Sequence, residues 1–179
     1  MKTLIVVDMQ NDFINGSLGT KEAQAIVPNV KKKIEEYRKR GDKIIFTRDT
    51  HFKNSYLHSL EGKHLPIEHC IAGTDGWQIA DNLASYEDKR IDKYSFGYDQ
   101  WDLNYFRGDN YEYSEQIELI GLCTDICVIS NALILKAMLP QICNIEIVVD
   151  ASCCAGTTPD NHKAALAAMK SCQINVIGE

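Results

Sequence analysis

Three residue types that cooperate in nucleophilic catalysis stand near the ends of separate apolar segments of this chain. Asp8 follows the first apolar run, Lys93 closes a weaker one, and Cys127 comes shortly after another. A thiol becomes a nucleophile when a base takes its proton and a nearby positive charge favours the thiolate. In the first turn of a helix, backbone N–H groups would also lower the pKa of the thiol and could hold an oxyanion. On position alone, a small residue packed under a sheet explains Cys127 equally well.

A second set of candidate residues lies in residues 48–76, which show little helical or strand period. Four of the five histidines of the chain fall there: His51, His58, His64 and His69. A connection of this length in a compact domain is usually functional or disordered, and its histidine content favours function. Asp49 and His51 are two residues apart, so in an extended chain their side chains share one face and could chelate one ion.

Strand-length apolar runs alternate with segments of helical period. Strands are predicted at residues 2–7, 43–47, 91–93, 116–120, 145–149 and 174–177, and helices at 28–40, 77–84, 100–106, 125–138 and 159–170. This alternation favours a three-layer α/β fold with helices on both faces of a mainly parallel, roughly six-stranded sheet. Ligands of open parallel sheets bind beyond the carboxyl ends of the strands. Asp8, Asp49, Lys93 and residues 121–127 should therefore converge on one crevice.

Composition restricts the class of protein. The chain has 179 residues, of which 45% are hydrophobic, so we expect a single domain over residues 1–179 with a long metal-site loop at about 48–76. A net charge of −6 argues against nucleic-acid binding, and the lysines at 31–33 are interpreted as a solvated helix face. Neither a span of ~20 apolar residues nor a signal peptide is recognisable, so a cytoplasmic protein without membrane contact is expected. Seven cysteines without a CxxC pair argue against a disulfide framework.

Three motifs, taken in order along the chain, indicate a family. Residues 6–13 (VVDMQNDF), 48–51 (RDTH) and 121–128 (GLCTDICV) together resemble the isochorismatase-like cysteine hydrolases, and among these the nicotinamidases most. The resemblance extends from Leu4 to the last predicted helix. It implies the isochorismatase-like hydrolase fold and the hydrolysis of a linear amide through a thioester, with nicotinamide and water giving nicotinate and ammonia.

The resemblance assigns a role to each residue at the strand ends. Asp8 matches the catalytic carboxylate of the family, Lys93 its lysine and Cys127 its nucleophile. The backbone N–H groups of Cys123 and Cys127 would form an oxyanion hole. The peptide bond Leu122–Cys123, just before the nucleophile, would be cis.

A divalent metal is implied in the same way. Asp49, His51 and His69 match the metal ligands of nicotinamidases, and Glu61 is a candidate for a further ligand, with His58 behind it. One carboxylate and two imidazoles suit zinc, iron(II) or manganese, and zinc is the first choice. In the nicotinamidases the metal binds the pyridine nitrogen and orients the ring.

The expected substrate pocket departs from the family pattern. Nicotinamidases hold the pyridine between aromatic side chains, and Phe13 matches one of them. The other should come shortly before His69, where this chain has Leu65 and no aromatic residue. Candidates to replace it are Tyr94, Phe96, Tyr98 and Trp101. We therefore expect Phe13, Leu65 and Tyr94 to bind a small-molecule amide, and because relatives are often oligomeric we expect a homo-oligomer.

Other functions are open at this point. A cysteine amidase acting on another small carboxamide or carbamoyl compound, or an isochorismatase-type hydrolase, would share the catalytic residues, but those branches generally lack the metal ligands. A non-catalytic redox sensor could use the thiol of Cys127, but sensing needs no general base such as Asp8. A Rossmann dinucleotide site is disfavoured because no glycines follow the first strand. Four cysteines have no assigned role and are expected to serve packing: Cys143, Cys153, Cys154 and Cys172.

Overall fold

The computed structural model describes residues 1–86, 89–139 and 144–179, in which six strands form one sheet. β1 (Lys2–Val7) and β4 (Gln116–Leu122) lie at its centre. β2 (Lys43–Asp49) and β3 (Arg90–Lys93) continue it on one side, and β5 (Glu146–Ala155) and β6 (Asn175–Ile177) on the other. Every neighbouring pair in the order β3-β2-β1-β4-β5-β6 is parallel. The predicted α/β fold with a parallel sheet is confirmed.

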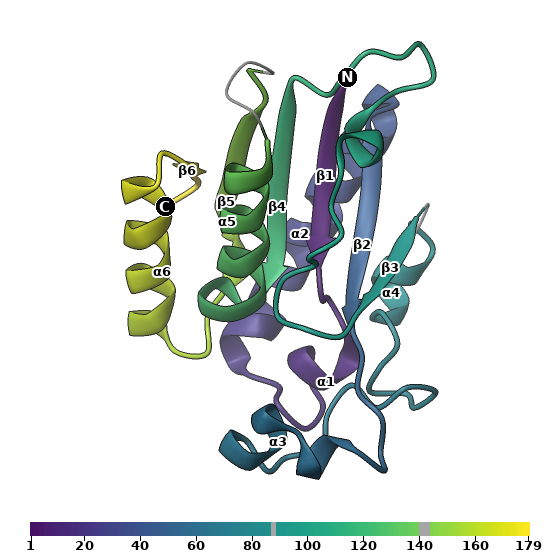
Figure 1. The fold of residues 1–179 in the computed structure, drawn as a ribbon, viewed down its shortest axis with the longest axis vertical. Helices are drawn as coiled ribbons and strands as arrows, with labels where there is room; N and C mark the ends of the chain where they lie inside the picture. Colours follow the sequence, from purple (N-terminus) through teal and green to yellow (C-terminus); the bar gives the residue numbers. More distant parts are fainter. Residues whose placement is uncertain (87–88, 140–143) are drawn as a thin grey trace.

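Helices cover both faces of this sheet (Figure 1). α2 (Lys21–Arg40) lies behind it, and α5 (Ile129–Met138) and α6 (Pro159–Ser171) lie in front. Successive residues of a strand point to opposite faces, so β1 contributes to two cores. Leu4 and Val6 belong to the core under α2, whereas Ile5 and Val7 belong to the core under α5 and α6. The three layers are those predicted.

The first long helix begins earlier than predicted. α2 starts at Lys21 and not at Pro28, because the Thr20 side chain accepts a hydrogen bond from the Ala23 N–H and caps the helix. Pro28 removes one backbone donor inside the helix. The buried side chains of Ile26 and Val30, on either side of it, nevertheless keep the helix on the sheet.

Other predicted elements have different bounds. The helix predicted at 77–84 is confined to α4 (Asp81–Ala84), because Ile79 pairs with Gln10 in an antiparallel bridge. The helix predicted at 125–138 begins as a π-helical turn, η3 (Thr124–Val128), before α5. The helix predicted at 100–106 is the short 3₁₀ turn η2 (Leu103–Phe106). β5 runs beyond the predicted end at 149, because it resumes pairing with β4 after a register shift.

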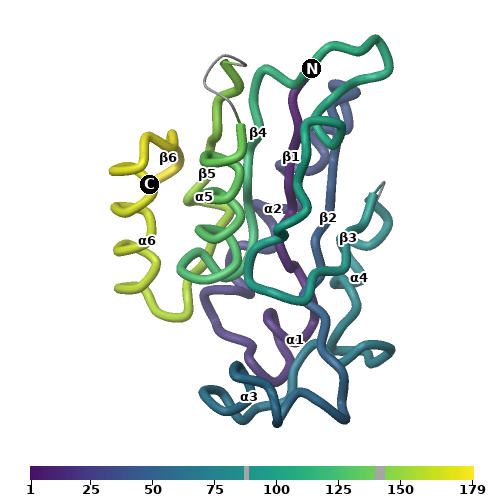
Figure 2. The backbone as a smooth tube through the Cα atoms, in the orientation of Figure 1, coloured from purple at the N-terminus to yellow at the C-terminus, as the bar shows by residue number. Residues whose placement is uncertain are grey.

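The predicted metal-site loop contains regular structure of its own. η1 (Tyr56–His58) and α3 (Leu60–His64) lie within it, and His51 pairs with Ile71 in a parallel bridge. Figure 2 shows α3 and α1 (Asn11–Ile14) at the same end of the molecule, beyond the carboxyl ends of the central strands. The loop thus closes the end of the sheet at which ligands are expected.

The lysines at 31–33 are not simply a solvated helix face. Lys33 Nζ lies 2.8 Å from a carboxylate oxygen of Glu118 and 2.8 Å from one of Asp150. The Tyr37 hydroxyl also donates to Glu118, at 2.6 Å. The prediction was wrong for Lys33 because helical periodicity places it on the same face as Val30 and Tyr37, toward the sheet.

Three of the four cysteines expected to serve packing lie in the described residues. Cys153 and Cys154 are buried in β5, in agreement with packing, whereas Cys172 is exposed at the end of α6 and does not serve packing. Cys143 lies outside the described residues. Within the described parts of the chain, no helix has the length and hydropathy needed to cross a bilayer.

Candidate active site

The carboxyl ends of four strands meet at the predicted crevice. Asp8 follows β1, Asp49 and Lys93 end β2 and β3, and Cys127 lies in the turn after β4. Asp8 has a φ of 48°, in the left-handed region that aspartate adopts more readily than most residues. The chain leaves the sheet at this residue, with the Asp8 carboxylate buried among the other strand ends.

Lys93 lies at the centre of the catalytic candidates. Its Nζ is 2.7 Å from Asp8 Oδ2, 3.3 Å from Asp49 Oδ1 and 3.5 Å from Cys127 Sγ. It also donates to the carbonyl oxygen of Ser95, at 3.1 Å. Asp8, Lys93 and Cys127 are 0%, 1% and 4% exposed. The structure therefore brings together a carboxylate, an ammonium and a thiol that come from distant parts of the sequence.

The buried environment sets the protonation states of these groups. Burial raises the pKa of Asp8 above its ordinary value, although Lys93 opposes the shift. Burial also raises the pKa of Cys127 well above its ordinary value, and Asp8 and Asp49 add to this effect against Lys93. The expectation of a lowered pKa for Cys127 at the start of a helix is therefore wrong, because the effect of burial is larger. The resting side chain is a thiol, close to a base that can take its proton.

The turn that carries Cys127 depends on Gly121. Gly121 has a φ of 120°, and a Cβ atom there would lie 2.1 Å from the Val7 carbonyl oxygen, so β4 can end this close to β1 only with glycine. The next peptide bond, Leu122–Cys123, is cis as predicted. Burial raises the pKa of Cys123 to about 12. A protonated thiol at Cys123 agrees with a role for its backbone alone.

A cluster of potential metal ligands adjoins these residues. Asp49, His51, Glu61 and His69 each offer one ligand atom, and these atoms lie within 4.8 Å of one another. The Nε2 atoms of His51 and His69 are 2.8 Å and 3.6 Å from Asp49 Oδ2, and each is 3.5 Å from Glu61 Oε1. Glu61 thus joins the three predicted ligands. His58 is exposed and is not a member of the cluster.

The donor atoms of this cluster fit a divalent cation. His51 Nε2 is buried and, despite its closeness to Asp49, has no hydrogen-bond partner among the described residues. His69 Nδ1 lies 2.9 Å from the Ile67 carbonyl oxygen, so this nitrogen is the donor and Nε2 is left to bind a metal. Burial alone would lower the pKa of His69. The hydrogen bonds with Asp49 and Glu61 outweigh burial and raise this pKa to about 10. The cluster therefore favours a positive charge, and its donors suit zinc, iron(II) or manganese.

A cavity of about 1030 Å³ connects the nucleophile with the cluster, since Cys123, Cys127 and all four potential ligands line it. The predicted substrate-binding residues Phe13, Leu65 and Tyr94 line it as well. The Phe13 ring lies 5.6 Å from that of His69, beside the cluster. Tyr94 is 68% exposed and stacks on Phe52, so it belongs to the mouth of the cavity.

Of the other aromatic candidates, Phe96 lines the cavity, whereas Tyr98 and Trp101 pack against the core under α5. Phe96 is 46% exposed, so its ring is available to a ligand. The second aromatic wall expected of a nicotinamidase is therefore not supplied by Tyr98 or Trp101.

Three supporting residues of the site were not predicted. Thr47 Oγ1 donates to Asp8 Oδ1 at 2.7 Å. Gln10 accepts from the Asp49 N–H at 2.7 Å and donates to the Asp49 carbonyl oxygen at 2.9 Å. Tyr56 packs edge-on against the rings of His51 and His69. The sequence could have indicated Thr47, because residues two apart in a strand face the same side of the sheet and Thr47 is a polar residue two positions before Asp49. No sequence pattern marks Tyr56.

The fold and this arrangement have relatives among known proteins. A model of the isochorismatase domain matches residues 2–178. The chain belongs to the isochorismatase family. This confirms the predicted family and, at that level, the prediction of a hydrolase.

Individual relatives of this isochorismatase-family chain are named as nicotinamidases, one of them probably inactive, or as a pyrazinamidase. The chain is 27% identical over 176 residues to a nicotinamidase of Saccharomyces cerevisiae, and the match covers 74% of this chain and 80% of the yeast protein. It is 28% identical over 181 residues to a probable inactive nicotinamidase of Arabidopsis thaliana, covering 94% and 87% of the two chains. The crystal structure of a pyrazinamidase of Pyrococcus horikoshii in complex with zinc has a TM-score of 0.81 and 27% identity, and the match covers 99% of each chain.

Proposed function

We propose that this protein is a metal-containing cysteine amidohydrolase and that its substrate is nicotinamide. The proposal rests on one observation above all. The cavity that Cys127 lines is also lined by Asp49, His51, Glu61 and His69. A nucleophile and a cation site that face the same cavity suit a substrate with a carboxamide at one end and a metal-binding atom at the other.

The reaction begins with proton transfer from the Cys127 thiol to Asp8. The sulfur then attacks the carbonyl carbon of the amide. Lys93 Nζ lies 2.7 Å from the base and 3.5 Å from the sulfur, so it stabilises the carboxylate before the transfer and the thiolate after it. The backbone N–H groups of Cys123 and Cys127 hold the oxyanion, a contribution of roughly 3–4 kcal/mol per donor.

The same carboxyl group completes the cycle. Asp8 gives its proton to the leaving nitrogen, so that ammonia departs and a thioester to Cys127 remains. Asp8 then takes a proton from water, which attacks the thioester, and the proton returns to the sulfur as the carboxylic acid leaves. One amide and one water give one acid and one ammonia. The raised pKa of Asp8 suits a group that accepts and returns a proton twice in each cycle.

Asp49, His51, Glu61 and His69 would hold the metal, for which zinc is the first choice and iron(II) and manganese are alternatives. When bound, the metal supplies a Lewis-acid site for a ring nitrogen and so orients the substrate. Asp49 contacts both halves of the site. Its Oδ2 faces the two imidazoles, and its Oδ1 accepts a hydrogen bond from Lys93 at 3.3 Å.

The lining of the cavity favours a neutral substrate. Among the described residues that line it, none is a lysine or an arginine, while the acidic residues Asp49 and Glu61 are present. Much of the remaining wall is apolar, from side chains such as Leu65, Phe96 and Ile126. A substrate that carries carboxylates, such as isochorismate or an acidic carbamoyl compound, would meet Asp49 and Glu61 there and neither a lysine nor an arginine among the described lining residues. A neutral carboxamide fits better.

The test is ammonia release from nicotinamide, pyrazinamide and a panel of aliphatic amides. We expect nicotinamide to be hydrolysed and Cys127→Ala to be inactive, while hydroxylamine traps the thioester of the wild type as a hydroxamate. Cys154→Ala is the matched control, because Cys154 is a buried cysteine of β5 outside the cavity lining. Equal ammonia release by Cys127→Ala and wild type would reject the mechanism. Activity on other amides but not on nicotinamide would reject the substrate alone.

A further inference from the structure

A buried asparagine connects the nucleophile with the segment that follows Lys93. Asn131 lies on α5 and is 0% exposed. Its Nδ2 donates to the Cys127 carbonyl oxygen at 2.8 Å and to that of Phe96 at 3.5 Å. Its Oδ1 accepts from the Tyr98 N–H at 3.0 Å and from Trp101 Nε1 at 2.9 Å. The amide therefore uses both its donors and both its acceptor positions, on two separate segments.

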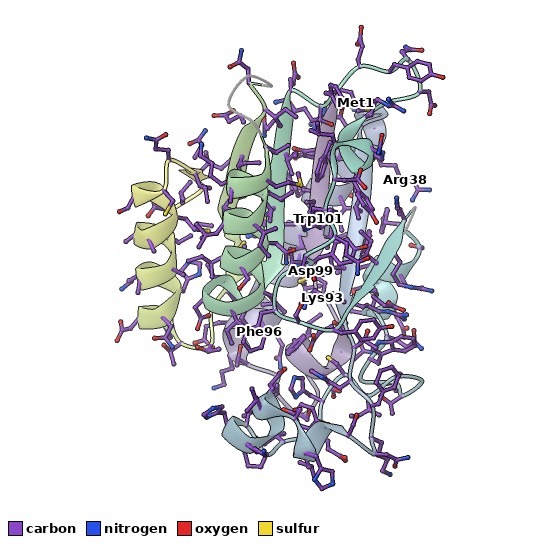
Figure 3. The ribbon with its side chains drawn as sticks, viewed as in Figure 1. Met1, Arg38, Lys93, Phe96, Asp99 and Trp101 are labelled. Atoms are coloured by element: carbon purple, nitrogen blue, oxygen red, sulfur yellow. The ribbon has the colours of Figure 1, made fainter. Side chains whose placement is uncertain are left out.

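The segment bound by Asn131 is also tied to the catalytic lysine. Lys93 Nζ donates to the Ser95 carbonyl oxygen at 3.1 Å, and Ser95 Oγ donates to the Gly97 carbonyl oxygen at 2.7 Å. Gly97 lies against α5, since a Cβ atom there would be 2.4 Å from Ile134 Cδ1. Figure 3 labels Lys93, Phe96 and Trp101 along this segment, which passes in front of the sheet toward α5.

The sheet fixes the distance between Lys93 and Cys127 only indirectly. Lys93 ends β3 and Cys127 follows β4, and the order β3-β2-β1-β4 places two strands between them. No ladder of strand hydrogen bonds therefore joins the two backbones directly. The described contacts of Asn131 supply a direct link, because they fasten the Cys127 carbonyl to residues 96–101. A purely space-filling residue of α5 would need neither of these partners.

We propose that Asn131 is a positioning residue that holds Lys93 Nζ and Cys127 Sγ at their working distance. It acts through the backbone of Cys127 and through residues 96–101, not on the substrate. The proposal depends on the proposed roles of Lys93 and Cys127. It does not depend on nicotinamide being the substrate.

Two substitutions separate the two sides of this link. Asn131→Asp retains an acceptor for Tyr98 and Trp101 but places an oxygen against the Cys127 carbonyl. Asn131→Thr can still donate to that carbonyl, as a threonine hydroxyl does four residues along a helix, but loses the acceptor for residues 98–101. The matched control is Leu135→Ala, a fully buried position of the same helix with no polar side-chain group.

The first readout is the rate at which iodoacetamide alkylates Cys127, followed by mass spectrometry of the peptide that contains it. We expect both Asn131 variants to react at least about tenfold more slowly than wild type, because a displaced ammonium favours the thiolate less. The second readout is amide hydrolysis, in which kcat should fall by a larger factor than KM rises, since Asn131 itself does not line the cavity. Leu135→Ala should lose thermal stability but keep the wild-type alkylation rate when folded.

Gly97→Val tests the same link if the Asn131 variants do not fold. The Cβ position of Gly97 lies 3.2 Å from the Ser130 backbone as well as 2.4 Å from Ile134 Cδ1, so a branched side chain needs more room than a shift of Ile134 provides, and it moves residues 96–101 away from α5 without changing Asn131. We expect slower alkylation of Cys127 there too. Alkylation at the Leu135→Ala rate in the folded Asn131 variants, or at the wild-type rate in folded Gly97→Val, would overturn the proposal. A Cys127→Ala protein that still hydrolyses amides would instead reject the proposed function and leave the alkylation result standing.

Discussion

Two clusters of buried charges lie on the same sheet and are built differently. Under α2, Lys33 lies 2.8 Å from each of Glu118 and Asp150, so this cluster contains its own cation. At the strand ends, Lys93 pairs with Asp8, while Asp49 and Glu61 face two imidazoles and favour a cation from outside. The ion pair with Lys33 lowers the pKa of Asp150 despite burial, whereas burial raises that of Asp8. The contrast suits a structural role for Asp150 and the proposed proton transfer by Asp8.

The largest expected effect separates the two aspartates. Asp8→Asn should lower kcat/KM for amide hydrolysis by about 10²–10⁴-fold, because the amide cannot take the proton of Cys127. Asp150→Asn should leave kcat/KM within about twofold, because Asp150 supports the fold and does not reach the cavity. Steady-state ammonia release measures both. Equal losses of activity in the two variants would mean that the clusters do not differ in role.

The proposed metal site gives the second prediction. His51→Ala should reduce bound metal and lower activity by about 10–100-fold, since one of four ligands is lost. His58→Ala is the matched control, because His58 is exposed in the same loop and lies outside the cluster. Elemental analysis and ammonia release are measured on the same samples. Wild-type protein that is fully active after exhaustive chelation, with no metal detectable, would contradict the prediction.

The internal cation gives the third prediction. Lys33→Met should lower the free energy of unfolding by about 2 kcal/mol, because it leaves Glu118 and Asp150 without their cation. The loss is smaller than for a fully buried ion pair because Lys33 is partly exposed to solvent. Lys32→Met, at the exposed neighbouring position, should change it by less than about 0.5 kcal/mol. Urea unfolding measures both free energies. Activity per folded molecule should be unchanged, and a large fall in kcat for Lys33→Met would remove the distinction between the clusters.

The two clusters also show how far the sequence alone leads. Asp8, Asp49, Lys93 and Cys127 could be placed in one crevice because they stand at the ends of apolar strands, and strand ends of a parallel sheet meet. Lys33 and Asn131 could not be found this way, since each depends on what a helix face meets across the core. Glu61 was only a candidate because the conformation of the loop, not its spacing from His69, brings its carboxylate to the cluster.

The smallest expected effect is a separation of activity from unfolding in acid. The pKa of Asp8 is raised above 3.8, so activity should fall as pH decreases through that raised value, where Asp8 becomes protonated. The pKa of Asp150 is lowered from 3.8 in the folded protein. The contribution of Asp150 to stability is therefore complete above pH 3.8 and is lost only as the pH falls through the lowered, folded-state pKa. At pH values between the raised pKa of Asp8 and the lowered pKa of Asp150, the protein should be folded and reversibly inactive. The pH dependence of kcat/KM, circular dichroism and metal content measured on the same samples tests this. Because acid also releases metal from imidazole ligands, only inactivation with the metal retained counts as protonation of Asp8, and inactivation that coincides with unfolding would contradict the raised pKa.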